Sequence, residues 1–330
     1  MNKNTIIPKK LINIGEIRVI APVRSMGLLS ENSKYFAKEA LEKKGFRLSF
    51  GKRVDETDEF MSSSVESRIL DLHEAFSDDN IDAILSVIGG YNSNQLLDYI
   101  DYSLIEKNPK IICGFSDMTA LANAITVKTG MITYIGPHFS SWGMKQGFEY
   151  SAEYFMKSCL KSEPFEIFSS SKWSDDPWYI DQENRIFKEN EGPWIINEGH
   201  AIGKIYGGHV RCFNALQGTE YFPDLKDTVL FLEEDAEINP QLFDRQLQSI
   251  IQQKDFSGVN AILIGRFQNE TKMTLDIIKK IIKTKKELDS IPVIANLDFG
   301  HTTPMFTIPI GGVAQVNSEN GECSIKIIEH

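Results

Sequence analysis

The sequence is poor in cysteine and has no long apolar run. Its four cysteines, Cys113, Cys159, Cys212 and Cys323, are far apart in 330 residues and form no C-x-x-C pair. This spacing excludes a small disulfide framework and matches no zinc-site pattern, so we expect reduced thiols and no metal ion. No apolar run reaches 18 residues, and no apolar segment typical of a signal peptide follows residues 1–10. We therefore expect a cytoplasmic protein without a membrane partner.

Basic residues are also in the minority, with 35 Lys and Arg against 46 Asp and Glu and a formal net charge of -11. Binding to a phosphate backbone requires clustered Lys and Arg. The one basic cluster, residues 279–286, contains Ile281 and Ile282, a pattern typical of the solvated face of an amphipathic helix. A nucleic-acid polymer is therefore not an expected partner, whereas a nucleotide-sized ligand is compatible with the charge.

The first 150 residues alternate between short apolar runs and helical patterns. The runs fall at 17–21, 46–50, 83–88 and 110–113, and helical patterns fall at 31–44, 62–76, 95–99 and 118–129. Such alternation predicts an α/β fold with a parallel sheet and helices on both of its faces. Ligands bind these sheets beyond the carboxyl ends of the strands, which is where residues 89–90 and 114–117 fall.

The composition changes after residue 150. Residues 151–198 are polar and turn-rich, and short strand patterns return from residue 199 with two helical stretches at 241–253 and 275–286. The last two strand patterns, at 306–310 and 324–328, look antiparallel. We therefore expect an N-terminal domain (1–150), a linker with an aromatic substrate loop (151–198) and a smaller β-rich α/β C-terminal domain (199–330).

The linker contains three tryptophans, Trp173, Trp178 and Trp194. They fit either packing at an interface or an aromatic wall for a flat ligand. Trp178 follows Asp175-Asp176-Pro177, a turn that we expect to present the indole at the tip of the loop.

The sharpest motif is Gly114-Phe-Ser-Asp117, which joins an apolar run directly to a helical pattern. A serine on such a turn is held out of the sheet, and the N–H of the next residue points into the same space. That arrangement suits a nucleophile and an oxyanion donor. By spacing alone Ser116 fits equally well as a helix N-cap, and Met118 stands where α/β-hydrolases have a second glycine.

A second motif, Gly89-Gly-Tyr-Asn92, ends the preceding apolar run. Paired glycines allow the backbone to approach a ligand closely, so Gly90 is a candidate second oxyanion donor. We expect Gly89, Tyr91 and Asn92 to line the substrate site. The alternative is an ordinary turn with side-chain hydrogen bonds from its asparagines.

Six histidines restrict the choice of a base. His301 lies between Gly300 and a proline-containing loop after an apolar run, and three others in glycine-rich loops remain rivals: His138, His200 and His209. The best acids to orient a base are Glu233 and Glu234, at the end of the run 228–232. Strand alternation places them on opposite faces and leaves open which face meets the histidine.

Together these motifs resemble the LD-carboxypeptidase family of serine peptidases. Four matching segments occur in the family's order across about residues 17–312: 88–91, 114–117, 230–233 and 299–301. Segments 88–97, 197–199 and 216–220 resemble the microcin C self-immunity branch more than the murein carboxypeptidases. The resemblance implies a flavodoxin-like N-terminal domain, a C-terminal domain that completes the site, and a homodimer.

The resemblance also implies roles for individual residues. Ser116 would be the nucleophile, His301 the general base and Glu233 its orienting partner, with the N–H groups of Gly90 and Asp117 as oxyanion donors. No cofactor is needed for such a triad. The family often has Gly-Gly-Asn where this chain has Gly-Gly-His209, so His209 is either a substrate contact or a packed side chain.

The expected substrate is an aminoacyl or peptidyl nucleotide with an amide-like bond, with Trp178 stacked on the base. A murein tetrapeptide, cleaved by an LD-carboxypeptidase, is the alternative substrate. The remaining alternative is a small-molecule binding protein without turnover, in which no serine would be activated.

Overall fold

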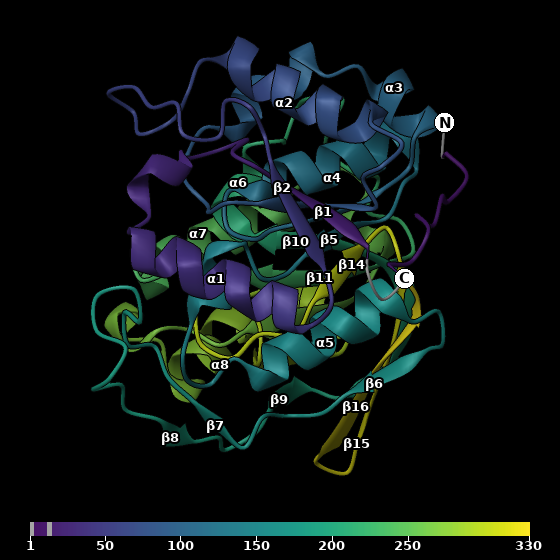
Figure 1. The fold of residues 1–330 in the computed structure, drawn as a ribbon. Helices are drawn as coiled ribbons and strands as arrows, with labels where there is room; N and C mark the ends of the chain where they lie inside the picture. The colour runs from purple at the N-terminus through teal and green to yellow at the C-terminus, as the bar shows by residue number, and fades with distance from the viewer. Residues whose placement is uncertain (1–2, 12–14) are drawn as a thin grey trace.

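The structure is a computed structural model that describes residues 3–11 and 15–330. Most of its strands belong to two sheets, one of six strands and one of eight. Figure 1 shows α2, α3 and α4 gathered at one end of the molecule and β9, β15 and β16 at the other. No helix in these described ranges is long and apolar enough to cross a bilayer.

The first sheet has the strand order β14-β5-β4-β3-β1-β2. Its strands are β1 (Glu16–Ile20), β2 (Arg47–Phe50), β3 (Ala83–Ser86), β4 (Ile111–Cys113), β5 (Thr133–Ile135) and β14 (Ile308–Ile310). The strands β1 to β5 run parallel in the flavodoxin-like order 2-1-3-4-5. This order confirms the predicted fold of the N-terminal part.

Helices cover both faces of this sheet because successive strand residues point to opposite sides. The helices are α1 (Glu31–Lys43), α2 (Val65–Ser77), α3 (Tyr102–Lys107), α4 (Met118–Thr129) and α5 (Glu149–Leu160). Ile17 and Val19 pack with α1 and α5, whereas Ile20 packs with α2, α3 and α4. Ser30 and Ser64 cap the first two helices by accepting a hydrogen bond from the N–H three residues ahead.

The second sheet has the order β6-β16-β15-β10-β11-β12-β13-β9. Its strands are β6 (Phe165–Ile167), β9 (Trp194–Asn197), β10 (Gly199–His209), β11 (Thr228–Glu233), β12 (Val259–Gly265), β13 (Val293–Leu297), β15 (Val313–Glu319) and β16 (Glu322–Glu329). Its central strands, β10 to β13, are parallel. The helices α6 (Val210–Asn214), α7 (Pro240–Ile251) and α8 (Leu275–Lys283) accompany it. In α8, Ile278, Ile281 and Ile282 are buried and Lys279 and Lys280 are exposed, as the amphipathic pattern predicts.

The domain boundaries that we expected at residues 150 and 198 do not separate the elements of one sheet from those of the other. Helix α5 runs through residue 150, and β6 and β9 from the linker extend the second sheet at both edges. Strand β14, from the C-terminal part, pairs antiparallel with β5 in the first sheet. These strands have three or four residues, too few for period-two alternation to stand out in the sequence.

Short elements complete the chain. A two-stranded hairpin of β7 (Lys172–Trp173) and β8 (Lys188–Glu189) closes off the loop 174–187. The short 3-10 helices are η1 (Met26–Leu28), η2 (Ser93–Tyr99), η3 (Ser140–Gly143), η4 (Phe256–Gly258), η5 (Asn269–Thr271) and η6 (Lys286–Leu288). Loop 174–187 is the aromatic loop, and the name is kept below.

Candidate active site

Ser116 occupies a strained turn between β4 and α4. Its φ is 60°, a left-handed conformation that costs of order 1–3 kcal/mol for a residue with a side chain. The N-cap of α4 is Asp117, without a side-chain cap hydrogen bond, and Ser116 Oγ lies 3.1 Å from His301 Nε2. The alternative in which Ser116 caps the helix is therefore wrong. The turn presents the hydroxyl outside the sheet, as a nucleophile requires.

The glycine pair after β3 lies directly against this hydroxyl. A Cβ on Gly89 would approach Ser116 Cβ to 2.9 Å and Oγ to 3.1 Å, so only glycine fits there. Arg24 Nε donates to the Gly89 carbonyl at 2.8 Å and holds the loop. Within the described ranges, neither the Gly90 N–H nor the Asp117 N–H has a protein acceptor. Both groups are therefore available to an oxyanion.

His301 and Glu233 complete a hydrogen-bonded chain with Ser116. Glu233 is the last residue of β11 and is 1% exposed. Its Oε2 lies 2.7 Å from His301 Nδ1. Gly300 has a φ of +100°, and a Cβ there would lie 2.7 Å from that same oxygen. The glycine therefore lets the loop after β13 bring the imidazole between carboxylate and hydroxyl.

Glu234 points elsewhere. Its carboxylate accepts hydrogen bonds from the Arg211 backbone N–H at 3.2 Å and from Arg211 Nε at 3.1 Å. The structure thus answers the question that strand alternation left open, because Glu233 and not Glu234 contacts His301.

Two of the rival histidines are engaged away from Ser116 Oγ. His138 is fully buried, stacks on Phe115 with ring centroids 4.1 Å apart, and has Nε2 2.9 Å from the Phe115 carbonyl. Burial lowers the pKa of His138 to about 3, so it is neutral at ordinary pH. His200 is exposed on β10 beside Asn317.

His209, the third rival, lies beside His301 with ring centroids 5.4 Å apart. Its backbone N–H donates to Thr119 Oγ1 in α4 at 3.0 Å. Its Nε2 lies 3.2 Å from a Glu234 oxygen and 3.4 Å from Asp235 Oδ2. Burial disfavours the imidazolium, but contacts with Asp235, Cys212 and Glu234 outweigh burial and raise the pKa of His209 well above its usual value.

The aromatic loop is tied to the loop that carries His301. Ser174 and Thr303 exchange two backbone hydrogen bonds of 2.8 Å, and the Asp175 carboxylate accepts from the Asn269 backbone N–H. Trp178 is half-buried; the exposed tip consists of Tyr179 and Ile180 instead, at 71% and 76% exposure. The indole is thus less exposed than we expected, because the turn that follows Pro177 exposes Tyr179 and Ile180 more than Trp178.

The other two linker tryptophans are structural. Trp173 packs against the Arg266 guanidinium, 5.0 Å from its ring centroid. Trp194 packs on the core of the second sheet, and its indole N–H donates to Glu191. Both indoles therefore make contacts within the chain itself.

The residues that follow the glycine pair differ in their environments. The Tyr91 side chain is 73% exposed and its hydroxyl donates to Glu237 after β11, at 3.1 Å. The Asn92 amide is engaged by Ser62 and Arg68. The Tyr91 hydrogen bond thus connects the loop after β3 with the loop after β11, whereas the Asn92 hydrogen bonds hold the loop after β3 in place.

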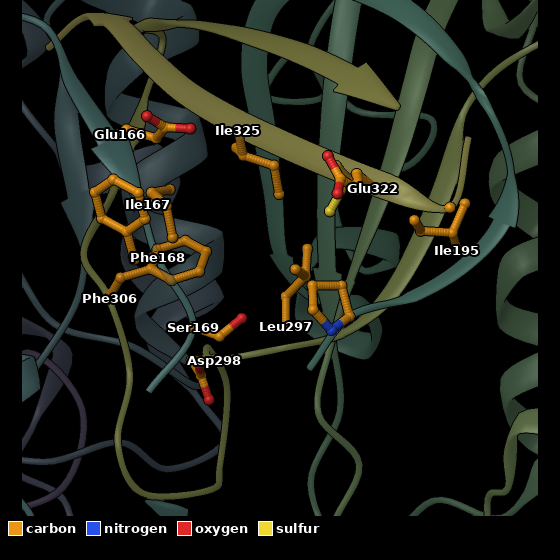
Figure 2. A pocket seen from close by; sticks show the side chains of 13 residues that line it. Glu166, Ile167, Phe168, Ser169, Ile195, Leu297, Asp298, Phe306, Glu322 and Ile325 are labelled. Carbon is orange, nitrogen blue, oxygen red and sulfur yellow. The ribbon is translucent and has the colours of Figure 1, made fainter. Parts of the chain in front are cut away.

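A cavity of about 400 Å³ lies between β6, β16 and the end of β13 (Figure 2). Phe168 and Phe306 lie on one side of it and Ile195 on the other, and none of Ser116, Glu233 and His301 lines it. Asp298, at its edge, is paired with the buried Arg266 and accepts a hydrogen bond from the Ser170 N–H. This ion pair fixes the backbone three residues before His301.

Sequence reasoning missed Arg24 and Asp235. Arg24 follows β1, and the rule that sites form at the carboxyl ends of parallel strands points to it. Asp235 follows Glu233 and Glu234 in an acidic run at the end of β11, which is the corresponding signal there.

Comparison with known proteins identifies the family. Residues 17–136 match the LD-carboxypeptidase N-terminal domain, and residues 202–316 match the LD-carboxypeptidase C-terminal domain. The chain is 51% identical to YocD of Bacillus subtilis over 97% of this chain and 99% of that protein. It is 29% identical to the microcin C7 self-immunity protein MccF of Escherichia coli, over 90% of this chain and 88% of that protein.

Solved structures agree with this assignment. An MccF-like protein from Bacillus anthracis has a TM-score of 0.98 and 50% identity, with 99% of this chain and 100% of that chain covered. MccF in complex with aspartyl sulfamoyl adenosine has a TM-score of 0.88 and 28% identity, with 98% and 99% covered. The chain therefore belongs to the LD-carboxypeptidase family of peptidases.

Proposed function

We propose that this chain is a serine carboxypeptidase-type hydrolase that cleaves the amide or acyl-adenylate-like bond of aminoacyl or peptidyl nucleotides. The observation that carries the proposal is the chain of hydrogen bonds from Ser116 Oγ to His301 and from His301 to the buried Glu233. A half-buried serine on a strained turn, linked to an imidazole that is itself oriented by a carboxylate, is the arrangement of an activated nucleophile.

The mechanism follows from these contacts. His301 Nε2 takes the Ser116 proton while Oγ forms a bond to the substrate carbonyl carbon. The N–H groups of Gly90 and Asp117 stabilise the resulting oxyanion. His301 then donates its proton to the leaving group as the scissile bond breaks, and Glu233 stabilises the imidazolium. Water, deprotonated by His301, releases the acid from the acyl-enzyme and restores Ser116.

Two observations support a nucleotide leaving group. MccF, a relative, has been solved with aspartyl sulfamoyl adenosine and with glutamyl sulfamoyl guanosine. In this chain, the Ser174–Thr303 bridge joins the aromatic loop, which carries Trp178, to the loop that carries His301. The half-buried indole on that loop offers a stacking surface for a base, and such stacking contributes about 1–3 kcal/mol.

A murein tetrapeptide is the second candidate substrate, because a relative of Pseudomonas aeruginosa is named murein tetrapeptide carboxypeptidase. The test compares kcat/KM of the purified full chain for aspartyl sulfamoyl adenosine and for a murein tetrapeptide. We expect hydrolysis of the nucleotide to be favoured by roughly 5- to 100-fold, the range that about 1–3 kcal/mol of base stacking supplies. Preference for the tetrapeptide would overturn the substrate assignment and leave the serine mechanism intact.

A further inference from the structure

Three possible metal ligands, far apart in the sequence, meet beside Ser116. His209 ends β10, Asp235 follows β11 and His301 follows β13. One ligand atom from each lies within 4.8 Å of the others. Because parallel strands end at the same edge of a sheet, the fold brings together three candidate ligands whose spacing in the sequence does not predict a metal site.

The spacing is close to what a small divalent ion needs. Zinc bonds of about 2.0–2.1 Å in a tetrahedron place ligand atoms about 3.3 Å apart. His209 Nε2 and Asp235 Oδ2 are already 3.4 Å apart. His301 is 18% exposed at the side chain, and binding requires its ligand atom to move from within 4.8 Å of the other two to about 3.3 Å from them.

In both imidazoles, Nδ1 is held by a neighbouring side chain. His301 Nδ1 is hydrogen-bonded to Glu233 at 2.7 Å, and His209 Nδ1 lies 3.2 Å from Cys212 Sγ. Metal-binding histidines are oriented in this way by a partner on the second nitrogen. Nε2 of His209 is buried and, among the described residues, makes no hydrogen bond of acceptable geometry. One ligand atom of His209 therefore lies within 4.8 Å of one ligand atom of His301.

The surrounding charge favours a cation. Five carboxylates lie on the residues around this space, and Arg211 is the cation paired with three of them. The five are Asp117, Glu233, Glu234, Asp235 and Glu237. Two imidazoles with one carboxylate select a transition metal such as zinc over Mg²⁺ or Ca²⁺, which prefer oxygen ligands alone.

We propose that Zn²⁺ binds reversibly to His209 Nε2, His301 Nε2 and the Asp235 carboxylate, with water in the fourth position, and that the bound ion inhibits hydrolysis. Binding releases the proton that His209 carries beside Glu234 and Asp235, since a metal ligand must be the neutral imidazole. Inhibition follows because the His301 lone pair that would accept the Ser116 proton is occupied by the metal. The inhibition rests on the proposed function, whereas the binding does not. The ion has no part in the serine mechanism itself.

The binding is tested by titrating ZnCl₂ into the full chain by calorimetry, and by recording the visible absorption of Co²⁺ as a substitute. We expect one ion per chain and a tetrahedral cobalt spectrum. Changing His209→Asn or Asp235→Asn should weaken Zn²⁺ binding by at least about tenfold, as even the loss of an outer-shell partner does. His200→Asn, at an exposed histidine of the same strand, is the matched control and should bind as the unmodified chain does.

The inhibition is tested separately by adding ZnCl₂ to the hydrolysis assay and reversing its effect with a chelator. Ser116→Ala should lose hydrolysis yet still bind one Zn²⁺, which separates failure of the metal site from failure of the proposed function. Circular dichroism confirms that each variant is folded. Absence of stoichiometric binding, or binding unchanged in both the His209→Asn and Asp235→Asn variants, would overturn the proposal.

Discussion

At the scale of single residues, the site combines backbone strain with burial. Ser116 is held at a φ of 60°, and Glu233 is a carboxylate at 1% exposure whose contact is the His301 ring. Neither arrangement is favourable on its own, since positive φ and a buried charge both cost free energy. The positive φ of Ser116 and the burial of Glu233 are both explained if the hydroxyl, imidazole and carboxylate act as one catalytic unit.

The two neighbouring glutamates provide a direct test at this scale. Glu233→Gln should lower kcat by about 10³- to 10⁴-fold, because an amide cannot hold the imidazole tautomer that accepts the serine proton. Glu234→Gln, on the opposite face and paired with Arg211, should lower kcat by about tenfold or less. Steady-state kinetics on both variants measures the difference, and the reverse order would contradict the assignment.

The buried His138 predicts a pH dependence of stability. Burial lowers its pKa from 6.5 to about 3 in the folded chain. Between these values the unfolded chain binds an extra proton, so this contribution to stability is complete above pH 6.5 and is lost as the pH falls toward 3. His138→Gln should therefore flatten the decline of the unfolding free energy between about pH 7 and about pH 5 in urea titrations. Parallel curves for the variant and the unmodified chain would show that His138 makes no such contribution.

At the scale of elements, the loops after β3, β4, β11 and β13 supply the candidate site, and the aromatic loop borders it. The Ser174–Thr303 bridge is the contact that couples that loop to His301. Because Trp178 is only half-buried, its indole retains a face that a planar ligand can cover.

Trp178→Ala should raise KM for aspartyl sulfamoyl adenosine by roughly 5- to 100-fold, the range set by about 1–3 kcal/mol of stacking. The effect on kcat should be small, because the contact is remote from the carbonyl and equal in ground and transition states. Ile180→Ala, at the exposed tip, is the control and should leave KM unchanged. Equal losses on a murein peptide, or a changed elution volume in gel filtration, would mean that Trp178 is structural.

Sequence patterns predicted most strands and helices of the first sheet but few of the elements in the linker. Long apolar and helical periods predicted β1, β3, β4, α1 and α4, since such periods are set by burial on one face. The edge strands β6 and β9 are short, and what makes them strands is pairing with distant partners. The Gly114–Asp117 turn was readable because its chemistry is local. The contact between His209 and Asp235 was not, because it depends on how β10 and β11 align.

At the scale of the whole molecule, the candidate triad is divided between the two sheets. Ser116 follows a strand of the first sheet, whereas Glu233 and His301 follow strands of the second. Helix α4 joins the halves through Asn123, whose side-chain Nδ2 donates to the Gly207 carbonyl in β10 at 2.7 Å. Its Oδ1 accepts from the Gly207 N–H at 3.3 Å.

Asn123→Ala should therefore lower the free energy of unfolding by about 1–3 kcal/mol, because it leaves the buried Gly207 N–H and C=O without partners. Asn80→Ala, in an exposed turn, should change it by less than about 0.5 kcal/mol. Chemical denaturation measures both values. Equal, small changes would show that Asn123 is not an energetically important link between the halves.

The central claim is that Ser116 is an activated nucleophile, and a fluorophosphonate probe tests it without assuming a substrate. The unmodified chain should be phosphonylated stoichiometrically, with mass spectrometry of peptides locating the adduct on Ser116. Ser116→Ala should remain unlabelled, and its turnover should fall by about 10³-fold or more. A folded chain that the probe leaves unlabelled, or an adduct on another residue, would contradict the serine mechanism.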